Sequence, residues 1–155
     1  MYKINVKQII DEDFANYKKP SMFIAFPKCN FKCGAKICQN APLAQMPNIE
    51  SETDEIVMRY VNNPITEAIV FGGLEPFDSF DDMLELIGDF RKATTDPIII
   101  YTGYYDSEIK EQLNQLKRFS NIIVKFGRYV ENREGRYDPV LGVTLASFNQ
   151  YAVKL

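Results

Sequence analysis

Four short apolar runs recur along the chain and predict its strands. They read MFIAF at 22–26, EAIVF at 67–71, PIIIY at 97–101 and NIIVK at 121–125. Each run is rich in β-branched or aromatic residues and is almost continuously apolar, which is typical of strands buried on both faces. Because such strands occur mainly in parallel sheets covered by helices, the pattern predicts a mostly parallel sheet.

The segments between these runs show the apolar period of helices. Residues 52–62, 81–92 and 107–118 each place apolar side chains on one face, and in 81–92 they recur at i, i+3, i+4 and i+7. Strands that alternate with helices imply right-handed crossover connections and an α/β domain. The chain has 155 residues without a linker or internal repeat, so we expect a single domain over 1–155.

Polar or glycine-rich loops follow the four predicted strands. They read FPKCNFKCGAKICQN, GGLEPFDS, TGYYD and FGRYVEN. In a parallel sheet all four loops would lie at one edge, at the carboxyl ends of the strands, where α/β domains bind their ligands. A cysteine cluster, a glycine pair, a Thr-Gly-Tyr turn and an arginine would therefore meet at that edge.

The first of these loops holds all three cysteines of the chain, Cys29, Cys33 and Cys38, and the chain has no histidine. Isolated cysteines are usually buried as small apolar residues, but these three share no apolar period and are interleaved with lysines. Nearby ammonium groups lower the pKa of a thiol and favour metal ligation. An odd number of cysteines also argues against a disulfide framework. The loop is therefore a candidate metal centre.

Two kinds of metal centre, and an inert role, are compatible with this cysteine loop. Structural zinc takes four ligands, and here the fourth would be a carboxylate or would come from another chain. Thiolates also hold iron–sulfur clusters, and a [4Fe–4S] cluster bound by three cysteines would keep one iron open to a substrate. The spacing favours the cluster, and zinc and an inert role remain as alternatives.

Charge and composition exclude several classes of function. The net charge of −3 argues against a nucleic-acid-binding role. No apolar run approaches 18 residues, and the first residues carry acids where a signal peptide would be apolar, so we expect a cytoplasmic protein without membrane contact. Without histidine, hydrolases with a catalytic triad lose their usual base.

The charges are unevenly distributed along the chain. Residues 48–89 carry eleven acids and a single base, whereas residues 117–155 carry seven bases and three acids. Solvated faces are the simpler explanation. A basic docking surface near the C-terminus is the alternative.

The cysteine loop and the turn FGGLEP at 71–76 together resemble the radical S-adenosylmethionine enzymes. The stretch YTGYYDSEIKEQLNQLKRFSNIIVKFGRYVEN at 101–132 is similar to a segment of anaerobic ribonucleotide reductase activating proteins, which carries a WTGY turn, a helix, a strand and a DGR or DGK turn. ASFNQYAV at 146–153 is similar to their C-terminal Gly-Ser-x-Asn-Gln segment. Where that family has Asp-Gly after the fourth strand, this chain has Phe-Gly, flanked by Lys125 and Arg128.

The resemblance implies a partial, open (β/α) barrel of the radical S-adenosylmethionine type with a mostly parallel sheet. It implies that a [4Fe–4S] cluster is bound by Cys29, Cys33 and Cys38, although the third cysteine comes two residues later than in the family spacing CxxxCxxC. The residues that would contact or flank bound S-adenosylmethionine are Gly72, Gly73, Glu75, Thr102, Gly103 and Tyr104.

The activity implied by the resemblance is the activation of a glycyl radical enzyme. An electron would pass from a small donor protein such as flavodoxin through the cluster and cleave S-adenosylmethionine. The 5′-deoxyadenosyl radical would then take a hydrogen from a glycine of the partner, which is expected to be the catalytic subunit of anaerobic (class III) ribonucleotide reductase. The alternatives are a radical peptide-modifying enzyme with another target and a non-catalytic partner subunit that binds an iron–sulfur cluster or zinc.

Overall fold

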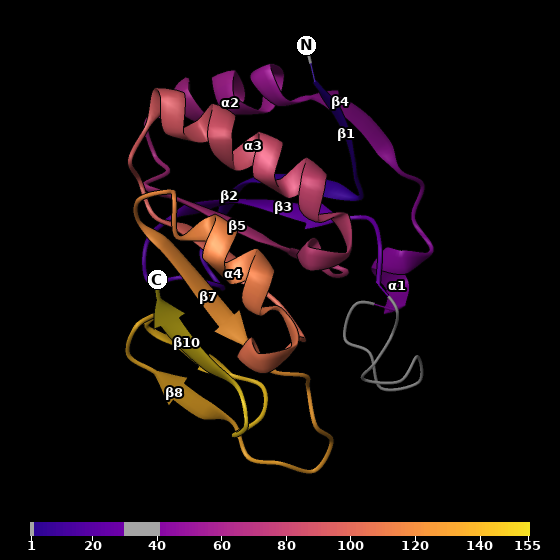
Figure 1. Cartoon of the computed structure of the whole chain (residues 1–155), viewed down its shortest axis with the longest axis vertical. Helices are drawn as coiled ribbons and strands as arrows, with labels where there is room; N and C mark the ends of the chain where they lie inside the picture. Colours follow the sequence, from indigo (N-terminus) through magenta and orange to yellow (C-terminus); the bar gives the residue numbers. More distant parts are fainter. Residues whose placement is uncertain (1, 30–40) are drawn as a thin grey trace.

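The computed structural model describes residues 2–29 and 41–155, and within them the largest element is a mixed sheet. Its strands lie in the order β10-β7-β6-β5-β3-β2 (Figure 1). In chain order they are β2 (Gln8–Asp13), β3 (Ser21–Phe26), β5 (Ala68–Gly73), β6 (Ile98–Tyr101), β7 (Ile122–Phe126) and β10 (Tyr151–Lys154).

The four strands that the apolar runs predict are β3, β5, β6 and β7, and they form the centre of this sheet. They pair parallel in that order, whereas β2 and β10 pair antiparallel at the two edges. The domain is therefore mixed α/β, with an open sheet among the described strands. Its assignment to the partial barrel of the radical S-adenosylmethionine type stays a prediction.

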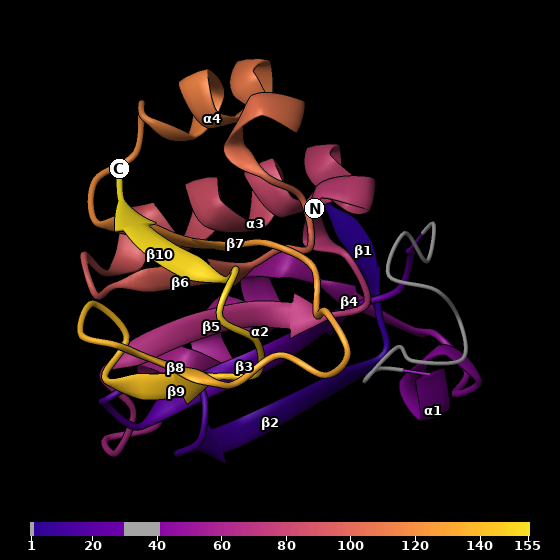
Figure 2. The same ribbon diagram turned by 90° about the horizontal axis from the view of Figure 1, so that it is seen from below.

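Helices cover one face of the sheet (Figure 2). The predicted helices are present as α2 (Thr53–Val61), α3 (Phe80–Ala93) and α4 (Lys110–Leu116). The apolar stripe of α3, from Met83 to Phe90, is fully buried in the larger core cluster, together with alternate side chains of the parallel strands. No helix in the described part of the chain is both long and apolar enough to cross a bilayer.

A short hairpin covers part of the opposite face, and the sequence did not predict it. It consists of β8 (Arg136–Asp138) and β9 (Val143–Leu145), which pair antiparallel (Figure 2). Leu141 and Leu145 from this hairpin pack with Val70, Ile99 and Ile123, the side chains that the sheet turns away from the helices. The sheet is thus buried on both faces, as its continuously apolar strands require.

The remaining elements lie near the N-terminus and at the strand ends. Strands β1 (Lys3–Val6) and β4 (Ile49–Glu52) form a separate antiparallel pair, and a single helical turn, α1 (Ala41–Ala44), precedes β4. Two 3-10 turns, η1 (Pro76–Ser79) and η2 (Asp106–Glu108), lead into α3 and α4. None of these short elements was predicted.

One buried carboxylate ties the hairpin to the edge of the sheet. Oδ1 of Asp138 accepts hydrogen bonds from the amides of Val140 (2.9 Å) and Leu141 (3.1 Å), and Oδ2 accepts one from the amide of Ala152 in β10 (2.9 Å). Asp138 is only 3% exposed, so water cannot replace these bonds if the side chain is removed.

We expect Asp138→Ala to lower the free energy of unfolding by about 2–4 kcal/mol, because three backbone donors lose their buried acceptor. Urea denaturation followed by circular dichroism measures this loss. Glu131→Ala removes an exposed carboxylate from the loop before β8 and should change stability by less than about 0.5 kcal/mol. Equal midpoints for the two variants would show that Asp138 does not hold the hairpin.

Candidate functional site

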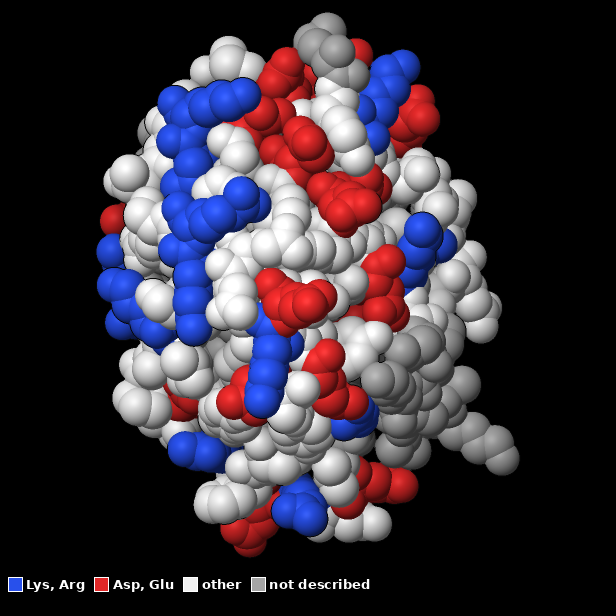
Figure 3. Space-filling view, viewed as in Figure 1, with Lys and Arg blue, Asp and Glu red and all other residues white. Residues whose placement is uncertain are grey.

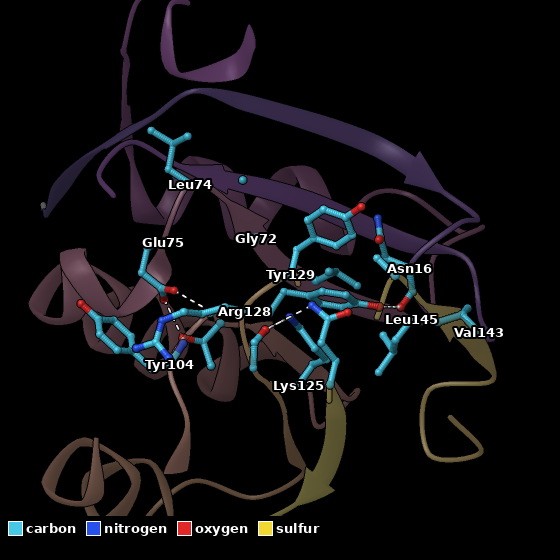
Figure 4. A pocket seen from close by; sticks show the side chains of 18 of the residues that line it. Asn16, Gly72, Leu74, Glu75, Tyr104, Lys125, Arg128, Tyr129, Val143 and Leu145 are labelled. Carbon is cyan, nitrogen blue, oxygen red and sulfur yellow. Dashed lines mark hydrogen bonds between the residues drawn. The ribbon is translucent and has the colours of Figure 1, made fainter. Parts of the chain in front are cut away.

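A cavity of about 310 Å³ lies at the carboxyl ends of the parallel strands, between the sheet and the β8–β9 hairpin (Figure 4). Residues from all four predicted loops line it, which confirms that the loops meet at one edge. Its polar or glycine lining includes Asn16, Cys29, Gly72, Gly73, Glu75, Thr102, Gly103, Tyr104, Lys125, Gly127, Arg128, Thr144 and Gln150.

All six residues predicted to contact or flank the cofactor line this cavity, and so does Cys29. Cys33 and Cys38 lie outside the residues that the structure describes. The structure therefore brings the glycine turn, the Thr-Gly-Tyr turn and the start of the cysteine loop together. The roles of these residues as ligands stay predictions.

The cysteine loop begins against the glycine turn. The amide of Leu74 donates to the carbonyl of Phe26 (3.2 Å), and the amide of Glu75 donates to the carbonyl of Lys28 (2.6 Å). Cys29 follows directly after the second of these bonds and is half-buried. The first thiolate of the predicted cluster is thus positioned by the end of β5 as well as by β3.

The side chain of Glu75 links the glycine turn to the loop after β6. Its Oε1 accepts from the amide of Gly103 (2.7 Å), and its Oε2 accepts from Oγ1 of Thr102 (2.8 Å) and from the amide of Phe77 (3.1 Å). Burial raises the pKa of Glu75 to about 7, although all three hydrogen bonds lower it. A ligand that contacts the carboxylate of Glu75 would therefore meet oxygens that already accept these three bonds.

The loops after β6 and β7 are joined in the same way by the backbone. The amide of Thr102 donates to the carbonyl of Lys125 (2.9 Å), and the amide of Gly127 donates to the carbonyl of Tyr104 (3.0 Å). The hydroxyl of Tyr104 also donates to Oδ1 of Asp78 (2.6 Å). This hydrogen bond connects the loop after β6 to the turn after β5. Three of the strand-end loops therefore form one bonded unit.

Strand packing explains the glycine at position 73. Gly73 has a φ of +80°, and a Cβ atom there would lie 2.6 Å from Cα of Ala25 on the neighbouring strand. A side chain would separate β3 from β5 just before the cysteine loop. Gly103, by contrast, would place a Cβ 3.5 Å from Oε1 of Glu75, at an ordinary contact distance.

Both cations that flank the Phe-Gly turn line the cavity, but they have different partners (Figure 4). The guanidinium of Arg128 makes an ion pair with the carboxylate of Glu108, at 2.6 and 2.7 Å, and lies over the ring of Tyr105. The ammonium of Lys125 donates to the carbonyl of Gly127 (3.1 Å). Burial lowers the pKa of Lys125 to about 8.

Several lining residues were not expected from the sequence. Asn16 comes from the segment between β2 and β3, and its carbonyl accepts a hydrogen bond from the hydroxyl of Tyr101 (2.6 Å). Nε2 of Gln150 donates to the carbonyl of Gly127 (3.1 Å), and Leu145 closes the cavity from the hairpin. Gln150 lies in the segment ASFNQYAV, so the resemblance in that segment was the available signal.

Fold and site together describe an α/β domain with a cavity whose lining includes Cys29, the first cysteine of the chain. The family model of the 4Fe-4S single cluster domain matches residues 20–145. The chain therefore belongs to this family and is an iron–sulfur protein. The match runs from the start of β3 to the end of β9, so it includes the cysteine loop and most of the cavity lining. Neither the curated proteins nor the solved structures contain a match to this chain.

The family membership confirms the prediction of a [4Fe–4S] cofactor and favours it over zinc. The donor set fits, because iron–sulfur clusters are held by thiolates and the chain offers three within ten residues. Cys29 lines the cavity together with the glycine turn. The assignment of all three cysteines as ligands stays a prediction.

We expect Gly73→Ala to destabilise the fold by about 1–3 kcal/mol or more, because it combines a strained φ with a clash against backbone. Gly103→Ala, a matched change on the same cavity, should cost less than about 1 kcal/mol. Thermal unfolding and iron content should be measured for both variants. If Gly73→Ala is as stable as Gly103→Ala, strand packing is not the reason for the glycine.

Proposed function

We propose that this protein is a radical S-adenosylmethionine enzyme, which cleaves S-adenosylmethionine reductively beside a cluster bound by Cys29, Cys33 and Cys38. The observation that carries the proposal is the position of Cys29. It lies at the cavity wall, and the residue before it is hydrogen-bonded to the glycine turn. A ligand in the cavity would therefore lie close to a cluster at the cysteine loop.

The cluster and the residues of the chain would have different roles in the reaction. When bound, the cluster would supply one electron and one iron without a cysteine ligand. With that electron, the bond between sulfur and C5′ of S-adenosylmethionine would break to give methionine and a 5′-deoxyadenosyl radical. The radical would take a hydrogen atom from the substrate and leave as 5′-deoxyadenosine.

The residues of this chain would bind the cofactor and exclude water. The glycine pair at the end of β5 lines the cavity, and the turn from Thr102 to Tyr104 forms the adjacent wall. Leu145 and the rest of the β8–β9 hairpin cover the cavity from the other side, so a reactive radical would be shielded from solvent.

We propose a glycyl radical enzyme as the substrate, with the catalytic subunit of anaerobic ribonucleotide reductase as its best candidate and a flavodoxin-like protein as electron donor. The support is the resemblance of the stretches 101–132 and 146–153, which supply much of the cavity lining. A radical enzyme that modifies another peptide is the nearest alternative. It differs only in the molecule that enters the cavity mouth.

The basic residues near the C-terminus divide between two faces. Figure 3 shows acidic side chains gathered over α2 and α3, and a band of basic side chains beside them over the ends of α3 and α4. Arg133 and Arg136 lie instead on and before β8, where both are exposed, and Arg136 lies over the ring of the exposed Phe148. We propose that this second group contacts the partner, because it belongs to the segment that covers the cavity.

The first test is anaerobic reconstitution with iron and sulfide. We expect a brown protein that converts S-adenosylmethionine to 5′-deoxyadenosine when dithionite is added. Cys29→Ala, Cys33→Ala and Cys38→Ala should each lose most of their iron and all cleavage, because two thiolates hold a cluster poorly. Met46→Ala changes an exposed residue that follows the cysteine loop in the sequence, and this variant should keep both its iron and its cleavage activity.

Each possible result of this test distinguishes between the candidate functions. A colourless protein that holds one zinc ion would favour a non-catalytic partner subunit. A brown protein that leaves S-adenosylmethionine intact would show an iron–sulfur protein with another role. Full iron content and cleavage in Cys38→Ala would remove the third ligand from the assignment.

The second test concerns the partner surface. Arg133→Glu with Arg136→Glu should lower the yield of glycyl radical on the partner several-fold at low salt, as measured by electron paramagnetic resonance. The deficit should shrink at high salt, because exposed charges are screened. Lys117→Glu with Arg118→Glu, on the α4 side, is the matched control. Equal yields for both double variants would exclude this surface as the docking site.

A further inference from the structure

A second cavity, of about 370 Å³, lies beside the first one. Asn16 and Phe23 line both cavities, so these two residues form the boundary between them. The ring of Phe23 also packs against the glycine turn, because a Cβ atom at Gly72 would lie 3.1 Å from Cζ of this ring. The other residues that line the second cavity are Gln8, Ile10, Asp13, Pro42, Leu43 and Met46.

The second cavity lies along β2, which is the last strand at one edge of the sheet (Figure 2). β2 pairs with β3 on one side, and no strand in the described part of the chain pairs with its other side. That side can therefore accept an added strand. At the opposite edge of the sheet, the amide of Ala152 in β10 already donates to the buried carboxylate of Asp138. The edge at β2 is thus better suited to an added strand than the edge at β10.

The lining of the second cavity suits a polypeptide. Ile10 is 37% exposed and Met46 is 41% exposed, so apolar side chains are available along this edge. The ammonium of Lys7 donates to the carbonyl of Met46, which holds the segment after α1 beside the start of β2. An extended polypeptide would cover these apolar side chains and pair with the backbone of β2, whereas a nucleotide or a lipid would leave the strand unpaired.

The charge of β2 indicates which polypeptide fits. The strand ends in three acids, Asp11, Glu12 and Asp13. The carboxylate of Asp11 pairs with the guanidinium of Arg59, whereas Glu12 and Asp13 accept from neutral amide groups and make no ion pair within the described residues. Two copies of β2 side by side would bring like charges together, which disfavours a second copy of this chain as the added strand. A strand with basic side chains would be attracted.

We propose that β2 and the second cavity bind an extended, basic segment of the substrate polypeptide, which adds to the sheet as a further strand. This inference rests on the proposed function, because the segment would bring a residue of the partner to the boundary at Phe23, beside the cavity in which the radical would form. The binding itself can be measured without S-adenosylmethionine.

The experiment uses reconstituted protein and two labelled heptapeptides, Lys-Val-Lys-Val-Gly-Val-Lys and its charge-reversed form Glu-Val-Glu-Val-Gly-Val-Glu. Fluorescence anisotropy should give a dissociation constant below about 1 mM for the basic peptide and binding at least roughly 10-fold weaker for the acidic one. High salt should reduce this difference. Saturation with the basic peptide should slow hydrogen–deuterium exchange at residues 8–13, because amides at the outer edge become hydrogen-bonded.

Neutral variants of nearly the same shape test the charge. Glu12→Gln with Asp13→Asn should bind the basic peptide about 3-fold to 10-fold more weakly. Asp54→Asn with Glu55→Gln removes two exposed acids from the start of α2 and is the matched control, which should bind as wild type does.

A second pair of variants tests the apolar contact. Ile10→Ser should weaken binding of the basic peptide several-fold, because the peptide would cover less apolar surface. Ile65→Ser changes an exposed isoleucine in the connection between α2 and β5, and this variant should bind the peptide as wild type does.

The possible results distinguish the inference from the proposed function. No binding of the basic peptide at about 1 mM, or equal binding of both peptides, would overturn the inference. Slower exchange at residues 136–154 in place of residues 8–13 would also overturn it, because the peptide would then bind at the hairpin. If the protein binds the basic peptide at β2 but leaves S-adenosylmethionine intact with dithionite, the proposed function fails and the polypeptide site stands. If it cleaves S-adenosylmethionine but binds neither peptide, only the inference fails.

Discussion

The buried carboxylate of Glu75 holds the site together. Its two oxygens accept from the hydroxyl of Thr102 and from the amides of Phe77 and Gly103, while its own amide donates to the carbonyl of Lys28. One residue thus joins the loops that follow β3, β5 and β6. Hydrogen bonds to a buried carboxylate are strong, and a buried donor that loses its acceptor costs free energy. These loops therefore cannot move apart without losing hydrogen bonds that stabilise the site.

Elements that depend on long apolar runs could be predicted from the sequence, and short ones could not. The four parallel strands and the helices α2 to α4 follow from continuous or periodic apolar residues. The strands β8 and β9 have three residues each, with a polar residue in both, so no period marks them. Their burial depends on apolar contacts across the sheet, which only the fold supplies.

The candidate site was predictable in its location but not in its internal bonds. The parallel order of the strands placed the glycine turn and the cysteine loop at one edge. The sequence could not show that Glu75 is bonded to Thr102 and Gly103, which follow it by 27 and 28 residues. It also could not separate Lys125 from Arg128, because that difference depends on the ion pair that Arg128 makes with Glu108.

The order of the elements along the chain sets the order in which the cavity can be completed. Its floor is formed by β3, β5, β6 and β7, whereas its cover, the β8–β9 hairpin, follows all of them in the chain and is fastened to β10 through Asp138. During synthesis from the N-terminus, Val70, Ile99 and Ile123 therefore stay without Leu141 and Leu145 until residue 145 has emerged. The nascent sheet thus presents an uncovered apolar face, and the cavity is enclosed only in the last stage of folding.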